Sequence, residues 1–355
     1  MITQENIKKF DLSDMMGVIA NFHNQVRNSI EFLKNSPKLQ DNYLIKRIVI
    51  AGMGGSAISG DLARSFIAKN HPEINIPIII VRNYDLPHWV DEHTLVICIS
   101  YSGNTEETLS IIQQAKENTS YIIGIASGGR LSEFCVQNNI GFVQVPGGMQ
   151  PRAALGYLFC AVYNFLIANF CKVCTISKSM IEEQILADYL ETKAREYGTL
   201  SEDNIAIKFA EELHNKQVII YSSSDVLDVI NLRWRGQIQE NSKNLAFGNL
   251  VPEMNHNEIN SLKYPKAIID NTYFVVLIDK NEHPSNRKRL ETLCKIIAEI
   301  TPNLRIVESK EEMPMIRLFE FIYLADWVSF YLGILNEQDP TEIELISKFK
   351  QIMSQ

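Results

Sequence analysis

Short apolar runs rich in isoleucine and valine alternate with amphipathic segments along the first half of the chain. These runs lie at 46–52, 74–82, 94–100, 121–127 and 141–147. They are continuously apolar and do not alternate with polar residues, which is typical of strands covered on both faces by helices. The first half is therefore predicted to be a doubly wound α/β domain with a parallel sheet.

The second half repeats this plan more loosely. Strands are predicted at 216–223, 273–279 and 303–309, and helices at 225–243, 284–300, 314–335 and 340–353. A polar helical segment at 176–214 bridges the two halves. We expect two similar α/β domains, residues 1–180 and 181–355, with the boundary somewhere in 165–205.

Composition fits a soluble two-domain protein. The chain has 355 residues, of which 46% are hydrophobic, enough for two cores. Its formal net charge is -8 and it has no long basic run, which argues against binding to nucleic acid or to a membrane surface. The N-terminus lacks a basic segment followed by an apolar one, so no signal peptide is predicted and we expect a cytoplasmic protein.

The apolar stretch 157–176 is the one transmembrane candidate in the sequence. Asn164, Asn169 and Lys172 interrupt it, which favours a buried core helix. It ends in a CxxC motif, Cys171 to Cys174, whose cysteines we interpret as small buried hydrophobic residues. The spacing of His, Glu and Cys does not resemble a zinc site, so we predict no metal and no cofactor.

A glycine-rich loop follows the first predicted strand and precedes a helix. It contains Gly54, Gly55 and Ser56. Small residues there let backbone N–H groups approach an anion at the positive end of the helix. The loop also resembles a dinucleotide-binding turn, but the acid expected after the second strand is missing, and Arg82 stands there instead. A simple tight turn is the third interpretation.

A second loop, after the third predicted strand, favours phosphate. It holds Ser100, Ser102 and Thr105 around a glycine, again just before a helix. Hydroxyl groups and helix N–H groups suit a phosphate monoester. Turn formation by the serines and helix capping by Thr105 are the alternatives. Because ligands bind at the carboxyl ends of the strands in such sheets, two such loops together predict a phosphate site.

Several segments resemble one enzyme family. AGMGGSAISGD and SYSGNTEET are similar to the two signatures of sugar isomerase (SIS) domains. PGGMQPRAALGYL, RWRGQIQENSK and VPEMNHNEI resemble the bifunctional phosphoglucose/phosphomannose isomerases, and the likeness runs through nearly the whole chain. The resemblance implies two SIS subdomains, flavodoxin-like and flanked by helices. It also implies a homodimer and metal-free aldose–ketose isomerisation of hexose 6-phosphates.

The resemblance also implies roles for individual residues. Glu240 is expected to be the base that forms a cis-enediol intermediate, and Arg152 to stabilise the enediolate oxygens. His256 is expected to open the sugar ring, presented to the active site of the partner subunit. Near the C-terminus, Lys348 is assigned to ring opening, with Lys350 as an alternative, and Thr341 to the acceptance of both C2 epimers.

Two of these assignments use further positions. Thr341 and Lys348 are seven residues apart, so on one helix they would share a face. Glu253 and Glu258 flank His256 and are expected to orient it. The alternatives are a non-catalytic SIS module that binds sugar phosphate and an isomerase of another phosphosugar. An NADP-dependent dehydrogenase is the least favoured.

Overall fold

The computed structural model describes residues 2–34, 36–171 and 176–353. These residues form two compact units, each described here by itself. The first, called the N-terminal unit, comprises residues 21–191. The second, called the C-terminal unit, comprises residues 1–20 and 192–355.

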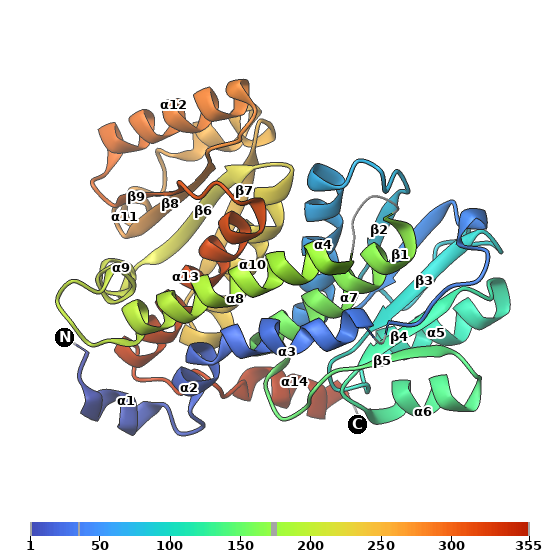
Figure 1. Cartoon of the computed structure of the whole chain (residues 1–355). Helices are drawn as coiled ribbons and strands as arrows, with labels where there is room; N and C mark the ends of the chain where they lie inside the picture. Colours follow the sequence, from blue (N-terminus) through green and yellow to red (C-terminus); the bar gives the residue numbers. More distant parts are fainter. Residues whose placement is uncertain (1, 35, 172–175, 354–355) are drawn as a thin grey trace. The chain divides into compact units, whose positions relative to one another are not determined.

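The N-terminal unit is built on a five-stranded parallel sheet (Figure 1). Its strands are β1 (Arg47–Ala51), β2 (Ile78–Val81), β3 (Thr94–Ile99), β4 (Ile122–Ala126) and β5 (Gly141–Gln144). The strand order is β2-β1-β3-β4-β5, with Val49 of β1 opposite Val96 of β3. The five predicted strands are therefore confirmed, and their order is that of a flavodoxin-like sheet.

Helices cover both faces of this sheet. On one face, α4 (Gly54–Asn70) packs on β1 and β2, and α7 (Leu155–Phe170) packs beside α4. On the other face lie α5 (Glu106–Asn118) and α6 (Gly129–Gln137), whose apolar side chains form a core with Val49 and Val96. Helix α3 (Phe22–Lys34) packs on α7. The short 3-10 helices η1 (Asn42–Leu44) and η2 (Pro151–Ala153) complete the unit.

The C-terminal unit has a four-stranded parallel sheet, ordered β7-β6-β8-β9. Its strands are β6 (Gln217–Ser223), β7 (Ala246–Val251), β8 (Thr272–Asp279) and β9 (Leu304–Ser309). Counted from its own first strand, this order is the order of the first sheet without a fifth strand. Two similar doubly wound halves, as the sequence predicts, are thus confirmed.

Helices also cover both faces of the second sheet. Helix α12 (Pro284–Ile300) contributes to a core with β6 and β8, and α10 (Val226–Ser242) packs between the sheet and α13 (Pro314–Leu335). The remaining helices of this unit are α1 (Gln4–Phe10), α2 (Met15–Ala20), α9 (Ile205–Leu213), η3 (Glu253–His256), η4 (Glu258–Ser261), α11 (Lys266–Asp270) and α14 (Glu344–Met353).

Strand β7 is the one strand among the described residues that the sequence pattern did not predict. It is an edge strand with the sequence AFGNLV, whose glycine and asparagine break the apolar run. Gly248 is required there, because a Cβ atom would lie 2.4 Å from the backbone oxygen of Ile220 on β6. Close approach of the backbone, and not hydrophobicity, selects this residue.

Along the chain the two units meet at 191/192, within the range 165–205 given by the sequence, and residues 1–20 belong to the C-terminal unit. Helices α1 and α2 belong to the C-terminal unit because they pack on α13, and the Tyr323 hydroxyl donates a hydrogen bond to the Ile19 carbonyl (2.9 Å). The junction at 191/192 falls inside the continuous helix α8 (Ile176–Gly198). Because the helix is continuous, no turn or linker sequence marks such a junction.

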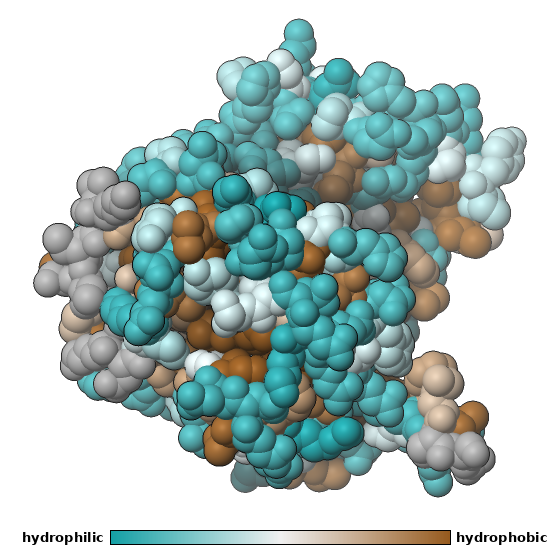
Figure 2. Space-filling view, turned by 90° about the vertical axis from the view of Figure 1, so that its right-hand side faces the viewer, coloured by the Kyte–Doolittle hydropathy of each residue, from teal (hydrophilic) through white to brown (hydrophobic). Residues whose placement is uncertain are grey.

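Each unit also contains one strongly apolar helix that is buried along nearly its whole length. Helix α7, which contains most of the apolar stretch 157–176, is buried along nearly its whole length, as expected of a core helix. Helix α13, which lies outside the stretch 157–176, is also long and apolar enough to cross a membrane, but 89% of its most apolar segment is buried inside the protein. Hydrophilic residues predominate on the face shown in Figure 2, with apolar residues in patches between them.

Candidate functional site

Two loops lie side by side at the carboxyl ends of β1 and β3, where the strand order of the first sheet reverses. Strands β1 and β3 are neighbours, and each runs into a loop that leads to the N-terminus of a helix, α4 after β1 and α5 after β3. The N-cap residues, Met53 and Thr105, make no side-chain capping hydrogen bond. The two first turns therefore direct backbone N–H groups toward a place where an anion is favoured.

Hydroxyl groups tie these two loops together. The Tyr101 backbone N–H donates to Ser56 Oγ (3.1 Å), and the hydroxyls of Ser100 and Thr105 lie 2.8 Å apart. Ser56 and Ser100 are buried, whereas Ser102 is exposed and accepts a hydrogen bond from the Asn104 N–H (3.2 Å). The Thr105 side chain thus contacts Ser100 and does not cap its helix, unlike the simplest alternative.

Arg152 lies against the glycine loop. It belongs to η2, just before α7, and only 3% of it is exposed. A Cβ atom on Gly55 would lie 2.8 Å from the Pro151 oxygen and 3.1 Å from Arg152 Cα. Gly55 is therefore needed for close approach of two backbones, and the approach brings Arg152 beside the start of α4. The predicted phosphate loops and Arg152 share one region of the N-terminal unit.

Two residues outside the predicted site hold this region in place. Gln25 of α3 donates to the Ala153 carbonyl (2.7 Å) and accepts from the Gly156 N–H (3.1 Å), so it fixes both ends of the turn that carries Arg152. The Tyr101 hydroxyl accepts from the Met149 N–H (3.1 Å) and links the second loop to the segment before η2. Gln25 has no sequence signal, whereas Tyr101 lies within the SYSGNTEET segment.

Arg82, the residue that the dinucleotide interpretation requires, has a partner inside the unit. Its guanidinium forms an ion pair with Asp61 of α4. The Asp61 carboxylate is largely buried, with 10% of its side chain exposed. This ion pair joins the end of β2 to α4, a structural use that the sequence alone did not reveal.

The equivalent loop of the C-terminal unit is acidic. Strand β6 runs into α10 through a loop with Asp225 at the N-cap position, and Ser223 Oγ donates to the Glu282 carboxylate (2.8 Å). Carboxylates at this end of the helix repel a phosphate. The anion-binding features are therefore concentrated in the N-terminal unit, although the two sheets share a topology.

Glu240 lies half-buried in the last turn of α10, between residues anchored on α13. Before it, Arg233 and Gln237 donate to Asp326 Oδ1 at 2.8 and 2.6 Å. After it, Asn241 Nδ2 donates to Ser329 Oγ (2.9 Å). The helix dipole by itself disfavours a carboxylate at this end of a helix.

The anchor on α13 is itself charged and buried. Burial raises the pKa of Asp326 above its usual range, and the charge of Arg233 opposes that shift. Both side chains are less than 5% exposed. Removing either partner would leave a buried charge uncompensated, so this pair fixes α10 on α13 specifically.

His256 is exposed at the end of η3. The neighbouring carboxylates make other contacts: Glu258 accepts hydrogen bonds from the Tyr221 hydroxyl (2.8 Å) and Asn249 (2.6 Å), and Glu253 accepts one from Asn257 (3.3 Å). These contacts hold the segment in shape around β6 and β7. In none of these contacts does Glu253 or Glu258 bind the His256 ring, as would be needed to orient it directly.

The C-terminal prediction requires one correction. Helix α14 begins at Glu344, so Thr341 precedes it, and the argument that Thr341 and Lys348 share a helical face does not hold. Asp339 accepts a hydrogen bond from the Thr341 N–H (2.7 Å), a turn that competes with a helix here. Lys348 and Lys350 are both exposed on α14.

The interpretation of Cys171 as a buried hydrophobic residue was wrong. Cys171 is only partly buried, and its thiol donates a hydrogen bond to Glu73 Oε1 (3.0 Å). Cys174, the other half of the motif, lies outside the described residues. Cys98, Cys135, Cys160 and Cys294 are buried, as expected. His71, Glu73 and Cys171 converge from distant parts of the sequence, which local spacing does not show.

Comparisons with known proteins agree with this arrangement. Residues 43–135 match the SIS domain family, and residues 202–353 match the bacterial phospho-glucose isomerase C-terminal SIS domain. A bifunctional phosphoglucose/phosphomannose isomerase from Caldicellulosiruptor bescii is 38% identical over 96% of this chain and 99% of its own length. A protein of the same name from Thermoplasma acidophilum is 33% identical over 86% of this chain and 89% of its own.

The fold is also found in solved structures. The tagatose-6-phosphate ketose/aldose isomerase from Escherichia coli superposes with a TM-score of 0.69, covering 93% of this chain and 95% of that one at 17% identity. This likeness supports the architecture of two SIS units. Together with the sequence similarity along nearly the full length of the curated relatives, it leads to one assignment: the chain belongs to the bifunctional phosphoglucose/phosphomannose isomerase family.

Proposed function

We propose that this protein interconverts hexose 6-phosphates by aldose–ketose isomerisation, converting glucose 6-phosphate and mannose 6-phosphate to fructose 6-phosphate. The observation that carries the proposal is the 38% identity to a bifunctional phosphoglucose/phosphomannose isomerase over 96% of the chain. Membership of the family also accounts for the SIS matches in both halves of the chain. A cytoplasmic role in glycolysis or mannose supply fits this activity.

The substrate phosphate is assigned to the two loops of the N-terminal unit. Backbone N–H groups at Gly54 and Gly55 and the hydroxyls of Ser56, Ser100, Ser102 and Thr105 supply donors for its oxygens. Two helix N-termini add favourable electrostatics for an anion. Ser56 already accepts a hydrogen bond from the Tyr101 N–H and Ser100 contacts Thr105, so little ordering of these hydroxyls is needed when the phosphate binds.

Glu240 is assigned the proton transfer. In the open-chain aldose its carboxylate removes the proton from C2 and returns it to C1, while a hydroxyl proton moves from O2 to O1. The intermediate is a cis-enediol. Because glucose and mannose 6-phosphates differ only at C2, both give the same intermediate, and one base that reaches either face serves both substrates.

Other residues are assigned to the charges and to ring opening. Arg152, a fixed cation, stabilises the oxygens on which negative charge develops. His256 and Lys348 open the pyranose ring, with His256 presented to the active site of the partner subunit in a homodimer. Thr341 contributes to acceptance of both epimers. None of these steps uses a metal ion or a cofactor.

The experiment that tests this function is turnover of fructose 6-phosphate in the presence of EDTA. Both glucose 6-phosphate and mannose 6-phosphate are followed for the wild type, for Glu240→Gln and for Glu299→Gln, a matched change at an exposed position on α12. We expect both products from the wild type and from Glu299→Gln, and a loss of both by about 10²-fold or more in Glu240→Gln.

Other results would point elsewhere. Formation of glucose 6-phosphate alone would reduce the activity to one epimer and remove the role of Thr341. Tight sugar-phosphate binding without turnover would favour a regulatory SIS module. Turnover of a different phosphosugar only would make the protein an isomerase with another substrate. Equal activity in Glu240→Gln and the wild type would refute the assignment of the base.

A further inference from the structure

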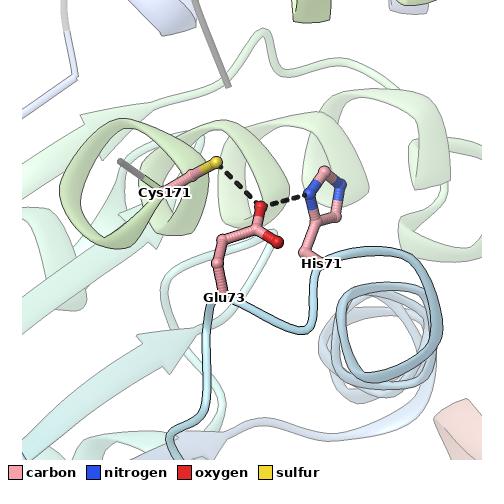
Figure 3. A group of neighbouring side chains, drawn as sticks. All are labelled: His71, Glu73 and Cys171. Atoms are coloured by element: carbon pink, nitrogen blue, oxygen red, sulfur yellow. Dashed lines mark hydrogen bonds and ion pairs between the residues drawn. The ribbon is translucent and has the colours of Figure 1, made fainter. Parts of the chain in front are cut away.

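His71, Glu73 and Cys171 form a cluster of three different donor atoms in the N-terminal unit (Figure 3). The carboxylate of Glu73 lies between the other two side chains: Oε1 is 3.2 Å from His71 Nδ1 and 3.0 Å from Cys171 Sγ. All three potential ligand atoms lie within 4.8 Å of one another. About one hundred residues of sequence separate Cys171 from the other two, and none of the three belongs to the proposed isomerase site.

We propose that this cluster is a binding site for one divalent transition-metal ion, with Zn²⁺ as the preferred ion. An imidazole, a carboxylate and a thiolate form a donor set typical of zinc. Zinc bonds of about 2.0–2.3 Å in a tetrahedron place neighbouring ligand atoms about 3.4–3.6 Å apart. The distance from Nδ1 to Oε1 (3.2 Å) is about 0.2 Å below that spacing and the distance from Sγ to Oε1 (3.0 Å) about 0.6 Å below it, so side-chain movements of less than about 1 Å are sufficient.

A second observation concerns the far side of the imidazole. His71 is buried, and its Nε2 lies 3.1 Å from the hydroxyl of Tyr163 on α7. In the tautomer in which Nε2 carries the proton, this hydrogen bond leaves the lone pair of Nδ1 directed at Glu73 and Cys171. A ring nitrogen held by a hydrogen bond while the other faces the ligand cluster is the usual arrangement around a metal-bound histidine.

The surroundings of the cluster favour a cation. His71 is the C-cap residue of α4 and Cys171 is the C-cap residue of α7, so two helix C-termini end at this place. Each carries a partial negative charge from its last carbonyl groups. Glu73 is exposed, which leaves a path for an ion from solvent. Binding replaces the thiol proton of Cys171, which is released to solvent as the Zn–S bond forms.

The ion would serve structure and not catalysis. The phosphate loop lies at the N-terminus of α4, and the cluster lies at its C-terminus, about 24 Å away along a helix of 17 residues. A metal bridge between His71, Glu73 and Cys171 fixes the C-terminal ends of α4 and α7 to each other. Isomerisation without a metal and a structural metal site are therefore compatible in one chain.

The test uses the full-length protein, reduced and freed of metal with a chelator that is then removed. Zn²⁺ is titrated and its stoichiometry and affinity are measured, and Co²⁺ is used as a spectroscopic probe. We expect one ion per chain, a rise in the unfolding temperature, and a thiolate-to-cobalt charge-transfer band. In Cys171→Ala the band is lost, whereas in the control Cys294→Ala, which removes a buried cysteine elsewhere, it remains.

A second, conservative variant tests the site independently if Cys171→Ala folds poorly. Tyr163→Phe preserves the ring packing on Phe66 and Phe159 and removes only the hydroxyl that holds His71. We expect it to weaken Zn²⁺ binding about ten- to a hundred-fold without a change in fructose 6-phosphate turnover. No zinc binding by the wild type, or binding unchanged in both Cys171→Ala and Tyr163→Phe, would overturn the proposal whether or not the protein is an isomerase.

Discussion

Arg233 of α10 and Asp326 of α13 form an ion pair in which Nη2 lies 2.8 Å from Oδ1, and both side chains are almost fully buried. The same carboxylate oxygen accepts a hydrogen bond from Gln237, three residues before Glu240. The helix that carries the proposed base is thus held on the most apolar helix of the C-terminal unit by a charged contact. Apolar packing alone would leave α10 freer to slide or rotate on α13.

Asp326→Asn should destabilise the protein by about 3–5 kcal/mol, because the charge of Arg233 stays buried without a counter-ion. The isomerase kcat should fall as well, since the α10 segment before Glu240 loses its anchor. Urea unfolding and turnover of fructose 6-phosphate measure the two effects. Glu308→Gln is the control: it breaks an ion pair with Arg287 in which both partners are about one-third exposed, and should change stability by less than about 1 kcal/mol.

Gly55→Ala should damage activity through the backbone of Arg152. The added methyl group would lie 2.8 Å from the Pro151 oxygen, and neither this atom nor Arg152 Cα belongs to a flexible side chain. We expect a loss of stability of about 1–3 kcal/mol and a fall in kcat/KM larger than that loss explains. Gly236→Ala, where nothing lies within 4 Å, should instead raise stability by about 0.5–1 kcal/mol. Equal activity in Gly55→Ala and the wild type would separate Arg152 from the chemistry.

The sequence predicts the sheets well because buried parallel strands have a strong and local signature. Strand β7 was not predicted because Gly248 interrupts its apolar run. That glycine is needed for the close approach of the β6 backbone at Ile220, a contact that the local sequence does not show. The loops of the phosphate site are readable from their small and hydroxylated residues. Gln25 and Asp326 are not, because a buried polar residue acquires its role only from the helix packed against it. The His71, Glu73 and Cys171 cluster escaped for the same reason.

Presentation of His256 across a dimer can be tested by mixing two inactive variants. If the proposal holds, a dimer of Glu240→Gln with His256→Ala contains one active site in which both residues are intact. After subunit exchange we expect recovery of at most about a quarter of the wild-type activity, as random pairing in a two-fold dimer allows. Each variant alone stays inactive. No recovery in mixtures proven to exchange subunits would place both residues in the active site of one chain.

Glu183 of α8 should make stability fall as the pH rises above 5. Burial raises the pKa of this carboxyl from 4.5 to about 8, so the folded protein keeps its proton over a range in which the unfolded chain has lost it. Between these two pKa values the folded state binds more protons, and the free energy of unfolding decreases by about 1.4 kcal/mol per pH unit. Above the folded pKa the decrease levels off.

Glu183→Gln removes this dependence because an amide does not titrate and fills nearly the same space. The variant should match the wild type near pH 5 and exceed it by roughly 3–5 kcal/mol near pH 8 to 9. Urea unfolding from pH 5 to 9 measures the difference, and Glu117→Gln, at an exposed position on α5, should follow the wild type. If the difference between Glu183→Gln and the wild type stays constant over this range, Glu183 is ionised in the folded protein throughout. A partner must then compensate its charge in the interior.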